Sequence, residues 1–310
     1  MSLIVTGTVG IDTVYTPSGE HRENVLGGSC AYFAAAAQHH ANVRIVGVVG
    51  DDFPDEFRTV LKHMPNIGLE GLETRKGSKT FRWGGKYLEN MDSRETLYTE
   101  LNVLIEEPPA VPAQYRDSKL VFLANSHPAV QMGLLEQIEQ PSLSVADTMD
   151  LWIDTARPEL DALMRKVDGL VLNYDEAQQL TGLTNTVAAA RKITTMGPKF
   201  VVVKKGEHGC LFVHGNRVGA IPAFPSDSVI DPTGAGDSFA GGMMGYLASR
   251  VEKGEIADVL SDFAVFRSAL AHGTVMASYV IESFSLDRIA NVTRDEGNAR
   301  FHQFREMVVF

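Results

Sequence analysis

A glycine-rich stretch in the last third of the chain has the residue types and spacing that suit phosphate chemistry. Residues 231–242 read DPTGAGDSFAGG, and an apolar segment from Ser238 to Ala248 with helical character belongs to the same run. Glycine and alanine leave little side chain above the backbone. Consecutive amides at a helix start then point at one place, with the positive end of the helix dipole behind them. We predict an anion-binding cradle formed by the amides of Gly234, Ala235 and Gly236.

Asp237 follows these three residues directly. A carboxylate beside a bound anion is electrostatically unfavourable and therefore needs a role. The predicted role is to accept a proton from a hydroxyl while the amides hold a migrating phosphoryl group. The alternative is a glycine turn that caps a helix, in which Asp237 only favours the N-terminus. The stretch is not a Walker A loop, because no G-K-[ST] follows it.

The spacing of Asp231, Thr233, Asp237 and the pair Gly241-Gly242 resembles the C-terminal signature of the ribokinase-like (PfkB-type) carbohydrate kinase family. This resemblance implies transfer of a phosphoryl group from ATP to a hydroxyl, with Asp237 as general base. It also implies that Asp231 and Thr233 support the nucleotide-binding loop. Four further stretches match the family pattern in the expected order, so the resemblance spans most of the chain.

Two of those stretches would contact the acceptor. Residues 7–12 resemble the family's first strand, with Asp12 at its C-terminal end, where a carboxylate can accept hydrogen bonds from vicinal hydroxyls. The alternative for Asp12 is a turn or cap residue. Gly27 and Gly28 match the family's diglycine motif, which lets the backbone approach a ligand closely, although such a pair alone is usually a turn. Tyr32 stands where the family often carries a sugar-binding asparagine.

The other two stretches would serve the metal and the nucleotide. Asn173 and Glu176 resemble the N-x-x-E motif that organises Mg²⁺ through its water shell, and Mg²⁺ needs few hard oxygen ligands. The alternative is a helix N-cap with a capping-box glutamate. Lys204, Gly206 and Gly209 match the family's nucleotide loop, in which the glycines permit a tight turn and the lysine offsets phosphate charge. The alternative there is a surface hairpin.

The elements that position these residues follow from the alternation of short apolar strands and helical segments over residues 120–205. Such alternation predicts an α/β, ribokinase-like fold, with a mostly parallel central sheet flanked by helices. We interpret residues 1–310 as a single kinase domain. Segments 14–25 and 78–105 do not fit the alternation, and we predict that they form a small β lid over the acceptor pocket. Exposed apolar side chains on that lid would support a homodimer. Asp147 ends a predicted strand. Its side chain would either face the site or serve only as a cap residue.

Composition excludes several classes of protein. Twenty-eight basic and 39 acidic residues give a net charge of −11, which argues against binding of nucleic acid or an anionic membrane surface. No apolar run reaches the roughly 18 residues of a membrane span. Cys30 and Cys210 are far apart and show no disulfide or zinc spacing, so we expect a reducing, cytoplasmic compartment.

Aromatic residues favour a nucleoside as the acceptor. Tyr32 lies in the predicted diglycine helix, and Phe81, Trp83 and Tyr87 lie in the predicted lid. A flat base favours aromatic faces beside the ribose site. We therefore predict transfer of the ATP γ-phosphate to a nucleoside 5′-hydroxyl, with Mg²⁺ and an optional monovalent cation as cofactors.

Three other functions are alternatives to this one. In a kinase of a free sugar such as ribose or fructose, the aromatic residues would only pack the lid or a dimer contact. A non-catalytic nucleotide or sugar sensor would not need the base Asp237. A dinucleotide-dependent dehydrogenase lacks support, because no G-x-G-x-x-G with a following acidic residue comes after the first strand.

Overall fold

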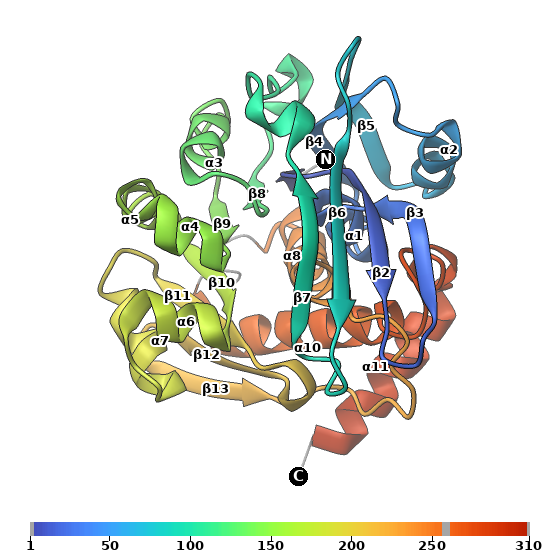
Figure 1. Cartoon of the computed structure of the whole chain (residues 1–310). Coiled ribbons are helices and arrows are strands. Elements are labelled where there is room, and N and C mark those ends of the chain that lie inside the picture. The colour runs from blue at the N-terminus through green and yellow to red at the C-terminus, as the bar shows by residue number, and fades with distance from the viewer. Residues whose placement is uncertain (1–2, 256–260, 309–310) are drawn as a thin grey trace.

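A large, mostly parallel sheet forms the centre of the molecule in the computed structural model, which describes residues 3–255 and 261–308 (Figure 1). Six neighbouring strand pairs are parallel, and only the last two pairs at one edge are antiparallel. The strands, in order across the sheet, are β13 (Arg217–Ile221), β12 (Cys210–His214), β11 (Phe200–Lys204), β10 (Gly169–Asn173), β9 (Leu143–Asp147), β8 (Leu120–Leu123), β1 (Leu3–Thr6), β4 (Val43–Gly50) and β5 (Ile67–Arg75).

Helices cover both faces of this sheet, because its strands are apolar on both sides. Every residue of β1, β4 and β8 is buried, as parallel strands between two helical layers require. One core cluster involves α1 (Ser29–Ala37), α2 (Asp55–His63), α8 (Ala235–Glu252), α10 (Phe263–Val280) and α11 (Arg294–Val308). The other involves α3 (Pro128–Leu135), α4 (Asp150–Thr155), α5 (Arg157–Met164), α6 (Tyr174–Thr181) and α7 (Thr186–Thr194).

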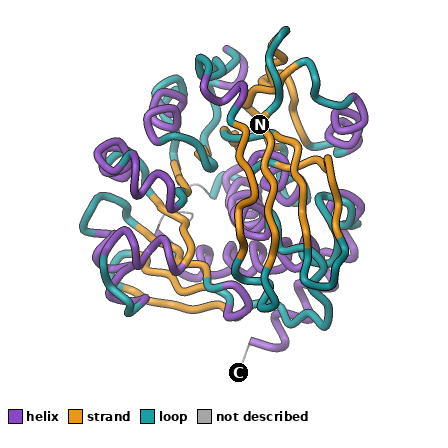
Figure 2. The backbone as a smooth tube through the Cα atoms, in the orientation of Figure 1, coloured by secondary structure: helices purple, strands orange, loops and turns teal. Residues whose placement is uncertain are grey.

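A second, four-stranded sheet stands as a layer of its own beside the larger one (Figure 2). Its strands, in order, are β3 (His21–Gly27), β2 (Gly10–Tyr15), β6 (Phe81–Tyr87) and β7 (Arg94–Glu100). Strands from both segments that interrupt the β-α alternation, 14–25 and 78–105, therefore lie in this small sheet. Every residue of the edge strand β7 is exposed.

The α/β class and the mostly parallel central sheet predicted from the sequence are confirmed. The position of Asp12 was predicted wrongly: the first strand ends at Thr6, and Asp12 lies inside β2 of the small sheet. Gly7 and Gly10 divide what looked like one continuous strand.

Strand β5 was not predicted, because its sequence IGLEGLETR has no continuous apolar run. Helix α8, which follows the glycine-rich run, begins at Ala235, three residues before the predicted start. No helix within the described ranges is long and apolar enough to cross a membrane.

Candidate active site

The glycine-rich run forms a tight loop that leads into α8. Gly234 is the N-cap residue and has a left-handed φ of 76°, which glycine adopts without strain. A methyl group on Gly234 would overlap the ring of Tyr32, so the ring packs directly on the loop backbone. Asp231 Oδ1 accepts a hydrogen bond from the Thr233 amide at 2.9 Å. The Ala235 amide donates to the Pro232 carbonyl at 3.1 Å, so one of the three amides predicted to bind an anion is engaged within the loop.

Asp237 lies in the first turn of α8 and is half-buried. Partial removal from water raises its pKa, and the positive charges of Lys204 and Arg94 act in the opposite direction. Lys204 ends β11 of the central sheet, and its Nζ lies 2.7 Å from where a methyl group on Gly236 would be. A carboxylate with a raised pKa beside a lysine and a helix N-terminus can accept a proton next to a bound anion.

Asp12 reaches the same place from the small sheet. Its side chain lies directly over Gly27, where any Cβ atom would overlap the carboxylate. Asp12 is only 4% exposed, and its Oδ1 has no hydrogen-bond partner among the described residues. Burial first, and then the charges of Asp231 and Asp237, raise the pKa of Asp12 to about 7, whereas a hydrogen bond from the Gly28 backbone lowers it. A buried carboxylate oxygen without a partner suits a ligand hydroxyl.

Two buried tyrosines accompany Asp12. Tyr32 is 1% exposed, and its hydroxyl has no partner within the described part of the chain. Burial and the neighbouring charges of Asp231 and Asp12 raise the Tyr32 pKa well above its ordinary value. The Tyr87 hydroxyl accepts a hydrogen bond of 3.1 Å from the Thr233 hydroxyl. Tyr87 also packs with Val14 in a small apolar cluster that Trp83 joins, so the small sheet and the loop at Asp231–Gly236 meet here.

Asn173 and Glu176 form a capping box at the start of α6. Asn173 Oδ1 accepts from the Glu176 amide at 2.8 Å, and Glu176 Oε2 accepts from the Asn173 amide at 2.7 Å. The helix-capping interpretation of this pair therefore describes the structure. Burial raises the pKa of Glu176, and Lys204 acts against that increase. Residues 3–255 and 261–308 contain no group of three His, Cys, Asp or Glu side chains arranged to hold a metal ion.

Asp147 lies near the same carboxylates. It ends β9, and its Oδ1 is buried without a hydrogen-bond partner in the described residues. Burial and the nearby charge of Asp237 raise its pKa well above the ordinary range, and Lys204 partly offsets this effect. These surroundings favour an Asp147 side chain that faces the site over one that serves only as a cap.

The loop from Lys205 to Gly209 joins β11 to β12 as a hairpin. The Lys205 amide donates to the Gly209 carbonyl at 2.7 Å, and Gly209 has a φ of 79°. Gly206 has a φ of 53°, and a methyl group there would overlap the Asp92 carboxylate. The hairpin interpretation is thus present in the structure, and the loop also touches the turn between β6 and β7. The sequence pattern did not indicate Asp92 or Arg94. No short motif around these residues shows which distant parts of the chain they approach.

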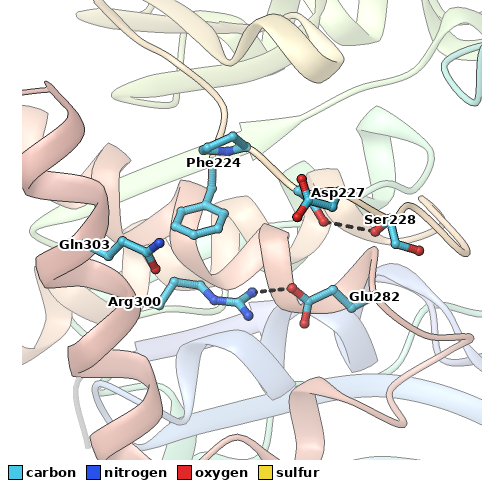
Figure 3. A pocket seen from close by; sticks show the side chains of 8 residues that line it. Phe224, Asp227, Ser228, Glu282, Arg300 and Gln303 are labelled. Carbon is cyan, nitrogen blue, oxygen red and sulfur yellow. Dashed lines mark hydrogen bonds and ion pairs between the residues drawn. The ribbon is translucent and has the colours of Figure 1, made fainter.

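A pocket of about 380 Å³ lies between the segment before the glycine-rich loop, the turn that follows α10, and helix α11 (Figure 3). Its Arg300 is paired with Glu282 at 2.7 Å and stacks on Phe224, with 5.1 Å from guanidinium carbon to ring centroid. None of the residues predicted to belong to the site lines it. We therefore locate the candidate site at Asp12, Asp237 and Lys204 instead.

Comparisons with known proteins show which family and which folds this chain is similar to. The family model "pfkB family carbohydrate kinase" matches residues 121–288. A cytidine kinase of Thermococcus kodakarensis is 31% identical over 256 residues, which is 81% of this chain and 90% of that protein. Two solved structures have similar folds. The nucleoside kinase of Burkholderia thailandensis in complex with inosine has a TM-score of 0.74, 18% identity, and coverage of 97% of this chain and 98% of that one. The ribokinase of Giardia lamblia has a TM-score of 0.78, 18% identity, and coverage of 96% and 99%.

Proposed function

The chain belongs to the pfkB family of carbohydrate kinases, and from that premise we propose that it phosphorylates a nucleoside at its ribose 5′-hydroxyl. Membership makes it an ATP-dependent nucleoside or carbohydrate kinase. The observation that carries the choice of a nucleoside is the presence of two aromatic side chains, Tyr32 and Trp83, near Asp12. The buried Tyr32 hydroxyl and Asp12 Oδ1 both lack partners among the described residues and suit ribose hydroxyls. The half-buried Trp83, opposite Asp12 in the strand register, offers an aromatic face for a base.

The proposed reaction uses Asp237 as general base. The acceptor oxygen bonds to the γ-phosphorus as its proton passes to the Asp237 carboxylate. The bond from that phosphorus to the bridging oxygen breaks, and its electron pair leaves with ADP. The amides of Gly234 and Gly236, together with Lys204, would stabilise charge on the transferring group. Asp231 and Thr233 hold the loop through the hydrogen bond already described, and Gly206 and Gly209 would allow the nucleotide close to the hairpin.

The carboxylates on the nucleotide side fit Mg²⁺ held mainly through water. Asp147 Oδ1 has no partner among the described residues, and one oxygen of Glu176 is left outside the capping box. Mg²⁺ usually keeps several waters and takes one or two carboxylates plus substrate phosphates, so a complete protein cage is not required. When bound, the ion would neutralise charge on the phosphates. Asn173 and Glu176 would then orient water, with the cap fixing both side chains.

We expect the Glu176→Gln variant to need a higher Mg²⁺ concentration for half-maximal activity. Glutamine can still accept the hydrogen bond from the Asn173 amide, so the capping box and the unfolding temperature should be retained. The negative charge that would order the hydrated ion is lost. Mg²⁺ titrations of initial rate at saturating ATP compare the variant with the wild type. A titration that superimposes on the wild type would limit Glu176 to its helix-capping role.

Acceptor use should depend on pH through Asp12. Because the Asp12 pKa is raised to about 7 and the ionised carboxylate accepts more hydrogen bonds, acceptor binding strengthens as the pH rises through this value. We expect kcat/KM for the acceptor to increase about tenfold between about pH 6 and about pH 8. The Asp12→Asn variant shows whether the inflection comes from Asp12 or from Asp237. If it comes from Asp12, the residual activity of this variant should lack the inflection. The same inflection in both proteins would assign it to another group.

Substrate preference tests the nucleoside assignment. We expect kcat/KM for the best of cytidine, adenosine and inosine to exceed that for ribose or fructose by more than about tenfold, or roughly 1.4 kcal/mol of transition-state discrimination. A coupled ADP-release assay with each acceptor in parallel provides the comparison. A free sugar preferred by the same margin would replace the nucleoside by a sugar and leave the kinase intact.

We also propose that the small sheet is a lid on a single kinase domain and supports a homodimer. Its edge strand β7 exposes two large side chains, Leu97, which is 49% exposed, and Tyr98. Apolar side chains on an edge strand favour pairing with another surface. Sedimentation of the purified chain at the mass of a dimer, with a shift toward monomer in Leu97→Glu, would support this proposal. A monomer at micromolar concentration would contradict it.

A further inference from the structure

The turn that follows α10, residues 281–287, is bonded to the start of the glycine-rich loop. The Ile281 carbonyl accepts hydrogen bonds from the amides of Ile230 and Asp231, at 2.8 and 3.4 Å. Burial raises the pKa of Asp231, and a hydrogen bond from the Ser285 backbone is among those that act in the opposite direction. Because Asp231 is the first residue of the glycine-rich run, the turn supports that loop at its beginning.

The C-terminal helix α11 anchors this turn. Arg300 of α11 forms an ion pair with Glu282 at 2.7 Å (Figure 3). It also donates to the Ser278 hydroxyl at 3.0 Å, and its guanidinium carbon lies 3.6 Å from the ring centroid of Tyr279. These contacts hold the end of α10 and the start of the turn together.

Ser285 connects the same turn to the acceptor side of the site. Its hydroxyl donates a hydrogen bond to the Leu26 carbonyl near the end of β3. Because β3 is an edge strand of the small sheet, its outer backbone groups have no strand to pair with, and the hydroxyl supplies a donor. Leu26 directly precedes Gly27, over which the Asp12 carboxylate lies. Ser285 therefore holds the strand against which Asp12 rests.

The backbone of Ser285 is strained. Its φ is 55°, in the left-handed region that residues with a side chain seldom adopt. The residue is 6% exposed, and both of its neighbours are packed: Phe284 in the apolar cluster with Tyr87, and Leu286 in the larger core. Such strain persists where the surrounding structure determines the conformation, and it concentrates at functional sites. Glycine would relieve the strain but would lack the hydroxyl.

We propose that Ser285 is a positioning residue, which fixes the acceptor side of the site relative to the glycine-rich loop. Its hydroxyl holds β3 and its backbone holds Asp231, so one residue joins the two sides. Phosphoryl transfer needs the reacting atoms within about 3–3.5 Å and in line, so the separation of the two sides affects the rate. Ser285 acts through these contacts and takes no part in the transfer itself. The inference rests on the proposed roles of Asp12 and Asp237, and it does not depend on which acceptor the protein prefers.

The test compares Ser285→Ala with Ser285→Gly. Alanine removes the hydroxyl and keeps the strained backbone, whereas glycine removes both the hydroxyl and the strain. If the backbone conformation alone mattered, Ser285→Gly would be fully active. We expect both variants to lose about tenfold or more in kcat/KM for the acceptor, while the Kd of ATP stays within about threefold of the wild type.

Gln140→Gly is the matched control. Gln140 is an exposed residue with a φ of 49°, and it lies in the turn before β9, at the amino end of the parallel strands. Glycine relieves the same kind of strain there without touching the site. Its kinetics should therefore equal those of the wild type. A loss equal to that of the Ser285 variants would indicate a general effect and would overturn the proposal.

A double variant tests whether Ser285 acts through Asp12. In the Asp12→Asn background, Ser285→Ala should cost less than about threefold in kcat/KM for the acceptor, because the group that Ser285 positions has already lost its function. The full loss in that background would overturn the proposal. Wild-type kcat/KM in either Ser285→Ala or Ser285→Gly would also overturn it.

Hydrogen–deuterium exchange provides a readout that needs no acceptor. The amides of residues 21–27 should exchange faster in both Ser285 variants than in the wild type, because β3 loses its bond to the turn. Unchanged exchange over these residues would mean that the hydroxyl does not hold β3, and the proposal would fail. A wild-type protein that phosphorylated neither a nucleoside nor a sugar would contradict the proposed function, whereas the exchange result would still decide the contact.

Discussion

Asp237→Asn should lower kcat by about 10²–10⁴-fold with little change in ATP affinity. Asparagine keeps the size and shape of the side chain but cannot take the acceptor proton. The carboxylate is half-buried in the first turn of α8, where burial raises its pKa and Lys204 keeps its charged form accessible. Pre-steady-state phosphoryl transfer with the purified variant measures the chemical step directly, and ATP binding is followed by calorimetry.

A matched control for this variant is Asp295→Asn. Asp295 also lies in the first turn of a long helix, α11, and is exposed. Removing its charge changes the same kind of helix-terminus interaction, worth about 0.3–1 kcal/mol, without touching the site. Wild-type turnover in Asp237→Asn would reduce that residue to a helix-start carboxylate. A similar loss of turnover in both variants would indicate a general effect of helix charge.

Gly27→Ala should reduce kcat/KM for the acceptor by about 10²-fold or more. An added methyl group would overlap the Asp12 carboxylate, which lies directly over Gly27. Asp12 is 4% exposed and cannot move into solvent easily, so either its side chain or β3 must shift. A misplacement of about 1 Å in a positioning group can cost about 10² in rate. ATP binding should be unaffected, because the change lies on the acceptor side.

The companion variant is Gly133→Ala in α3. Nothing lies within 4 Å of the added methyl group, so its activity should equal the wild type. Alanine favours a helix over glycine by up to about 1 kcal/mol, so its unfolding temperature should be equal or higher. Steady-state kinetics with the acceptor varied at saturating ATP compares the two substitutions. Unchanged acceptor kinetics in Gly27→Ala would mean that Asp12 does not bind the acceptor.

Much of the fold could be predicted because its signals are local. Continuous apolar strands such as β8 and β11 alternate with helices, and that pattern indicates a parallel sheet between two helical layers. Strand β5 was not predicted, because charged residues interrupt its apolar pattern. The strand that carries Asp12 was assigned to the wrong sheet, because two glycines break the chain without changing its apolar character.

The parts of the candidate site that consist of consecutive residues could be predicted from the sequence. The parts whose side chains are placed by the pairing register of two strands could not. The loop at Gly234 and the cap at Asn173 come from motifs of a few residues, and both are present as loop and helix starts. The cap at Asn173 is also the outcome that helix chemistry alone predicts. Arg94 and Tyr87 share one face of the small sheet because β7 pairs with β6 in one register, and no short motif encodes that pairing.

The central claim is phosphoryl transfer from ATP to a nucleoside 5′-hydroxyl, and the identity of the product tests it most directly. The purified protein is incubated with ATP, Mg²⁺ and each of cytidine, adenosine and inosine, and the product is examined by proton-coupled ³¹P NMR. A phosphate on the 5′-oxygen couples to the two protons of the adjacent methylene group, so we predict a triplet that appears as ADP accumulates and is absent with Asp237→Asn. A doublet, which marks a phosphate on a secondary carbon, or ADP without a phosphorylated nucleoside, would contradict the account.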